Sequence, residues 1–219
     1  MRHDNYARAI ISWLSVRKWK VVGVLPVAAL FILMLFLNAR KSPEVFEAPT
    51  GLALLNTIFL FAIPLIVALM AAKSHRATGV FAFAMIGCGL IFFSISNLYA
   101  GWLMPLAGGP NPTVTVHNLG ALFAGLFQFI GAHFFLRELT LGKAVKFRIQ
   151  RSEILYAVIF VLVSILAVLA FRGDLPVFFD PLGGPSFLRQ FVLVWAIGLF
   201  TITGFIFLEI RITVNTNFA

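Results

Sequence analysis

A few polar side chains lie inside long apolar stretches of this sequence. Amides, an imidazole and a guanidinium can donate and accept hydrogen bonds, so together they could hold a small or lipophilic ligand. An unpaired polar group in lipid costs about one to several kcal/mol, so such groups are expected to meet one another, water or a ligand. The candidate ligand-binding residues are Asn56, Asn97, His117, Asn118, Arg189 and Gln190.

These polar residues also have a purely structural interpretation. Asn56 and Asn97 fall at the same predicted depth, so a direct hydrogen bond between their helices would satisfy both amides. One helix face carries a small and polar stripe that suits either close helix packing or a pocket: His117, Ala121, Gly125, Gln128 and Ala132. We expect the opposite face to meet lipid, through Phe123, Phe127, Ile130 and Phe134. The sequence leaves the choice between packing and pocket open.

Catalytic and metal-binding motifs are missing from the sequence. It contains no C-x-x-C-H, H-E-x-x-H, G-x-S-x-G or phosphate-loop pattern. His117 and His133 are sixteen residues apart, about 24 Å along a helix, and cannot share a metal. We therefore expect neither enzymatic activity nor a cofactor or metal. A haem or quinone electron carrier using His75 and His133 is a third, more distant interpretation.

The candidate residues lie in apolar runs long enough to cross a membrane as helices. A hydrocarbon core of ~30 Å requires about 20 helical residues, and this chain is 61% hydrophobic and only 11% charged. We predict an all-α, six-helix transmembrane bundle over residues 21–208, with spans at 21–38, 51–72, 78–103, 116–136, 154–171 and 187–208. Residues 1–20 are predicted to form an amphipathic interfacial helix, and residues 209–219 a cytoplasmic tail or the start of a truncated output linker.

The basic residues predict the orientation. With both termini inside, 13 of the 17 Lys and Arg residues lie in cytoplasmic segments, as the positive-inside rule expects. The net charge of +9 then faces anionic lipid headgroups, and no motif supports nucleic-acid binding. We expect a multi-pass protein of the inner, cytoplasmic membrane.

Proline and glycine mark three irregular points. Pro64, in the middle of the second span, should kink that helix because it lacks an N–H and clashes with the preceding turn. Two outer loops rich in Gly and Pro, 105–112 and 174–185, are predicted to form ordered caps.

Several of these features occur together in one known family. The second span begins Pro49-Thr50-Gly51, the third ends Ser96-Asn97-Leu98-Tyr99-Ala100-Gly101, the fourth opens with His117-Asn118, and the last follows Asp180-Pro-Leu-Gly-Gly-Pro-Ser-Phe-Leu-Arg-Gln. This order resembles the MASE3-type membrane sensor domains of histidine kinases and diguanylate cyclases. In that family the third span typically ends in an Asp-Leu-Leu-His-type motif, where this chain has residues 96–99. The resemblance implies that residues 211–219 lead toward further spans or a cytoplasmic output domain.

The expected function is therefore a membrane-embedded sensory, ligand-binding domain with an outer-leaflet polar pocket that signals to the cytoplasm. The alternative is a non-catalytic structural subunit of a larger membrane complex, whose small-residue stripes bind partner helices. Expected partners are membrane lipids, a small or lipophilic ligand, and a second copy or other membrane subunits.

Overall fold

The computed structural model describes residues 32, 35–36, 49–106, 110–141, 152–180 and 182–217. The chain divides into two units, Met1–Glu47 and Ala48–Ala219, and nearly all described residues belong to the second. The predicted interfacial helix at 1–20 lies outside the described residues, as does the first predicted span at 21–38 except for three helical positions.

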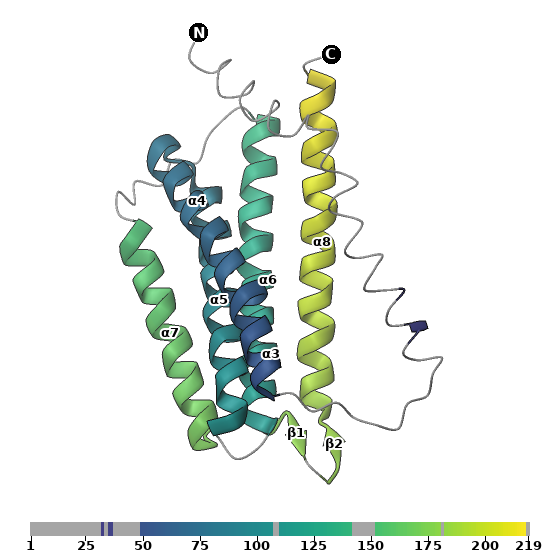
Figure 1. Cartoon of the computed structure of the whole chain (residues 1–219). Coiled ribbons are helices and arrows are strands. Elements are labelled where there is room, and N and C mark those ends of the chain that lie inside the picture. The colour runs from purple at the N-terminus through teal and green to yellow at the C-terminus, as the bar shows by residue number, and fades with distance from the viewer. Residues whose placement is uncertain are drawn as a thin grey trace. The chain divides into compact units, whose positions relative to one another are not determined.

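The second unit is a bundle of long helices whose consecutive members run in opposite directions (Figure 1). A first hydrophobic column consists of α3 (Pro49–Leu55), the π-helix η1 (Asn56–Ala62) and α4 (Ile63–Thr78). The remaining helices are α5 (Phe81–Leu106), α6 (Pro110–Leu141), α7 (Ser152–Arg172) and α8 (Phe187–Asn217). A short antiparallel hairpin, β1 (Phe179–Asp180) with β2 (Gly184–Pro185), precedes α8. We call the end of the bundle where this hairpin lies the hairpin end.

Five of the described helical segments are long and apolar enough to cross a membrane: Ala53–Thr78, Phe81–Trp102, Pro110–Thr140, Glu153–Arg172 and Phe187–Ile212. Their outward faces carry many exposed large apolar side chains, among them Ile66, Leu162 and Val194. Apolar surface of this extent is typical of contact with lipid or with other proteins. The predicted helical class is confirmed, and the five apolar helices fit the predicted membrane class. The six-span count and the side on which the termini lie stay predictions.

Helix α5 is the centre of the bundle. In its most apolar window 67% of the residues are buried, against at most 28% in the other spans. Its side chains Met85, Cys88, Ile91 and Phe92 form the main core cluster, which Val163 of α7 and other residues complete. Helices α4, α6 and α7 all pack on α5, while α8 packs on α6.

Helix α6 is covered on two sides, which corrects the predicted face assignment. A Cβ atom on Gly125 would lie 3.3 Å from Leu199 Cβ, so α8 approaches the small stripe closely. Phe127, however, does not face lipid. It packs against the α5 core, with its ring 6.3 Å from that of Phe92. The prediction failed because α6 lies between two neighbours, so its aromatic stripe also meets protein.

The second span changes helix type just before Pro64. Because Pro64 has no N–H to donate to the preceding turn, the regular hydrogen-bond ladder is interrupted, and the π-helix η1 precedes it. Ser94 of α5 donates a 2.8 Å hydrogen bond to the Phe61 carbonyl, and Trp102 Nε1 donates a 3.1 Å hydrogen bond to Thr57 Oγ1. The irregularity that the structure shows next to Pro64 is a π-helix packed against α5, and the predicted kink stays a prediction.

The two Gly/Pro loops compare differently with their predictions. The described residues of the segment 105–112 are helical, since α5 continues to Leu106 and α6 begins at Pro110, a first position where proline costs no hydrogen bond. The segment 174–185 does form an ordered cap. Asn111 Oδ1 accepts hydrogen bonds of 2.9 Å from the N–H groups of Phe178 and Phe179, and Phe178 is buried.

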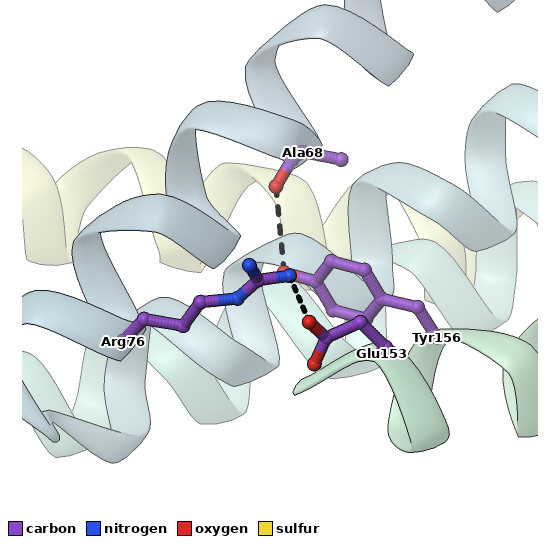
Figure 2. Close-up of polar contacts among 4 residues, drawn as sticks. All are labelled: Ala68, Arg76, Glu153 and Tyr156. Carbon is purple, nitrogen blue, oxygen red and sulfur yellow. Dashed lines mark hydrogen bonds and ion pairs between the residues drawn. The ribbon is translucent and has the colours of Figure 1, made fainter. Parts of the chain in front are cut away.

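At the end opposite the hairpin, α4 and α7 are joined by an ion pair and a hydrogen bond. Figure 2 shows Arg76 of α4 paired with Glu153 of α7, and the Tyr156 hydroxyl reaching the Ala68 carbonyl at 3.4 Å. Both charged side chains are more than half exposed, so the ion pair adds little stability.

Candidate functional site

Asn97 and His117 form the best-defined polar contact between α5 and α6. Asn97 is fully buried, and its Oδ1 lies 2.8 Å from His117 Nδ1. The Asn97 amide donates through Nδ2 to the Phe93 carbonyl at 2.8 Å, so its Oδ1 must accept. His117 therefore carries a proton on Nδ1. Its Nε2 has no hydrogen-bond partner in the described part of the chain and can face a further group.

Asn118, the next residue of α6, lies seven residues before Gly125, which contacts α8. Seven residues are about two helical turns, so the helical period places Asn118 on the same face. It is 3% exposed, and its Nδ2 has no hydrogen-bond partner among the described residues. Thr115, one turn earlier, is 1% exposed, and its hydroxyl also has no hydrogen-bond partner among the described residues.

Arg189 lies in the first turn of α8, at the same end of the bundle. Its Nε is buried and has no hydrogen-bond partner within the described ranges. The guanidinium carbon lies 6.0 Å from the centre of the Phe179 ring, and the group is within electrostatic range of His117. The Phe179 ring of the hairpin therefore lies beside the Arg189 guanidinium.

Two of the six predicted residues lie apart from Asn97, His117, Asn118 and Arg189. Gln190 is exposed, and its backbone N–H is bonded to the Ser186 carbonyl at 3.2 Å. Asn56, half-buried in η1, lies against Gly101, where an added Cβ would be 3.3 Å from Asn56 Nδ2. Asn56 makes no side-chain hydrogen bond to any described residue. Asn97 bonds to His117 and Phe93, so the alternative of a direct Asn56–Asn97 pair is not what the structure shows.

Sequence reasoning missed Thr115 and its neighbour Thr113, whose hydroxyl is also unpartnered in the described structure. The predicted fourth span began at 116, which left both threonines in a loop. The usable signal was the Pro110-Asn111-Pro112 run, because proline is favoured in a first helical turn. We define the hairpin-end cluster as Thr115, His117, Asn118 and Arg189.

The other histidines lie elsewhere. His75 is buried near the far end of α4, with Nδ1 2.8 Å from the Val80 carbonyl. His133 is exposed on α6, and its ring is 6.3 Å from that of Phe129. Within the described ranges, no group of three or more His, Cys, Asp or Glu side chains is placed to hold a metal ion.

Comparison of the chain with protein-family models, with curated proteins and with solved structures found no match. The functional argument therefore depends on the geometry of the hairpin-end cluster.

Proposed function

We propose that the chain is a membrane-embedded sensory domain that binds a small ligand at the hairpin-end cluster. The observation that carries this proposal is the set of buried, unpartnered polar atoms on two facing helices: Thr115 Oγ1, Asn118 Nδ2 and Arg189 Nε. Leaving one buried donor unsatisfied costs about 1–3 kcal/mol. A ligand with hydrogen-bond acceptors would remove that cost for all three atoms together.

The helix arrangement supports a route for the signal. Helix α8 packs mainly on α6 and continues without interruption from Phe187 to Asn217. A ligand between the two helices near the start of α8 would favour one angle between them, and the rigid helix would carry that change to the opposite end.

The proposed orientation places the hairpin end outside the cytoplasmic membrane and both termini inside. The 13-to-4 division of basic residues in the sequence supports it. A first span at 21–38 would complete the six-span bundle, and a MASE3-type relationship fits the same plan.

A structural-subunit role is the alternative, and it needs a surface other than the predicted small-residue stripe. Gly125 on that stripe is already in contact with Leu199 and Phe200 of the same chain. A subunit role would therefore depend on the lipid-facing surfaces of the outer helices.

The ligand-binding role predicts selective stabilisation of the purified protein. Thermal unfolding of the full chain would be followed with a panel of amino acids, carboxylates, phosphates, amines and uncharged amphiphiles. We expect at least one class of compound to raise the unfolding midpoint of the wild type by several degrees. The Asn118→Leu variant should no longer show this rise. Gln190→Leu, on the exposed side of α8, is the matched control and should keep it. Failure of every class to stabilise the wild type, or equal loss in both variants, would contradict a ligand site here.

A further inference from the structure

We infer that the hairpin-end cluster binds an oxyanion, the phosphate or carboxylate group of its ligand. This inference rests on the proposed ligand-binding function and specifies its chemistry. The first step concerns position. Helices α6 and α8 both begin at the hairpin and run side by side in the same direction (Figure 1).

The contact between α6 and α8 fixes their register. A Cβ on Gly125 would lie 3.6 Å from the Ala196 carbonyl, so these two positions face each other. Asn118 and Arg189 each lie seven residues earlier on their own helices. Seven residues are about two turns, or ~10.5 Å, and return to nearly the same face. Asn118 and Arg189 are therefore level with each other, on the facing sides of the two helices.

The second step concerns hydrogen-bond polarity. Asn118 Nδ2 and Arg189 Nε are donors only, and the Thr115 hydroxyl can donate as well. All three lack a partner in the described structure, so the missing group must present acceptors. A ligand made mainly of donors, such as an ammonium group, would leave these atoms unsatisfied.

The third step concerns charge. Arg189 makes no ion pair with any described residue. The Phe179 ring beside it carries no formal charge. Only the Nε of this partly buried guanidinium is enclosed, and no described carboxylate lies there to balance its charge. Water could accept from the Nε hydrogen but would leave the charge uncompensated. Guanidinium groups bind carboxylate and phosphate oxygens through short, charge-assisted hydrogen bonds. An oxyanion would therefore satisfy the donors and the charge at once.

Two sources could supply this group: a soluble anion, or the phosphate of a lipid headgroup, because Arg189 lies in the first turn of a helix long and apolar enough to cross a membrane. The test uses the full chain in uncharged detergent, with binding followed by thermal unfolding. The added probes are inorganic phosphate, acetate, phosphatidylglycerol and, as an uncharged lipid control, dioleoylglycerol.

We expect one or more of the anionic probes to raise the unfolding midpoint while dioleoylglycerol does not. Arg189→Gln should weaken that binding at least about tenfold. Arg172→Gln is the charge-matched control, since Arg172 is exposed and already paired with Asp174 at 3.0 Å, and it should bind like the wild type. Asn118→Leu gives a second, charge-neutral test if Arg189→Gln fails to fold. A response to phosphate or acetate identifies a soluble anion, and a response to phosphatidylglycerol alone identifies a headgroup.

Equal weakening by Arg189→Gln and Arg172→Gln would show general charge attraction and overturn the inference. A second contradicting result is that only an uncharged or cationic compound stabilises the wild type and that Asn118→Leu loses this stabilisation. That result would overturn the oxyanion inference but would support the ligand site. No response to any probe or to the wider panel would overturn both proposals.

Discussion

Gly120→Leu is expected to prevent the normal packing of α5 against α6, with the largest loss of stability among the changes considered. A Cβ at position 120 would lie 2.0 Å from Ser96 Oγ and 2.4 Å from Ser96 Cβ. Since Ser96 is itself buried on α5, it has no room to retreat and the two helices would have to separate. Overpacking of this kind costs about 1–3 kcal/mol and occasionally more.

Gly198→Leu is the matched control for this prediction. It makes the same replacement on a membrane-length helix, and a Cβ at Gly198 would meet no heavy atom of the structure within 4 Å. Both changes gain the same intrinsic helix propensity, so their difference reports packing. The yield of monodisperse protein and the midpoint of thermal unfolding in detergent should fall for Gly120→Leu only. Similar values for the two variants would mean that α5 and α6 are not in close contact at Ser96.

Asn97→Leu should give the second-largest effect, a loss of about 1–3 kcal/mol in the free energy of unfolding. The substitution keeps the approximate side-chain volume but leaves His117 Nδ1 without its 2.8 Å acceptor. Asn56→Leu is the control, because Asn56 is only half-buried and makes no side-chain hydrogen bond to the described residues. It should change stability much less.

A double-mutant cycle separates the Asn97–His117 hydrogen bond from general disruption. If the two side chains are coupled, the combined variant Asn97→Leu with His117→Phe should lose less stability than the sum of the two single variants. Strict additivity would argue against the pair.

The sequence predicted the five described membrane-length helices well, because such a helix requires about 20 apolar residues and a run of that length can be found in the sequence alone. It predicted the depth of Asn97 and His117 but not their pairing. Depth along a helix is set by residue number, whereas the direction of a side chain depends on which neighbours surround that helix. Asn97 lies on the central helix α5, between two neighbours, and the neighbour that satisfies it is α6 rather than η1.

Missing information about neighbouring helices and helix ends also explains the errors at Phe127 and Thr115. The 3.6-residue period correctly separated the faces of α6, but it cannot show that both faces meet protein, so Phe127 was wrongly assigned to lipid. Thr115 was lost through a boundary error, because the apolar run begins later than the helix does. Among the predicted ligand-binding residues, His117, Asn118 and Arg189 lie at the hairpin end, and their binding role stays a prediction.

The most direct test of the central proposal is an experimental structure of the full chain in lipid nanodiscs, at a resolution that shows ordered small molecules. We predict density for a non-protein group between α6 and α8, within hydrogen-bonding distance, ~3 Å, of both Asn118 Nδ2 and Arg189 Nε. Density compact enough for a phosphate or carboxylate would also support the oxyanion inference. A structure in which protein groups satisfy both atoms and fill the space between them would contradict the ligand site.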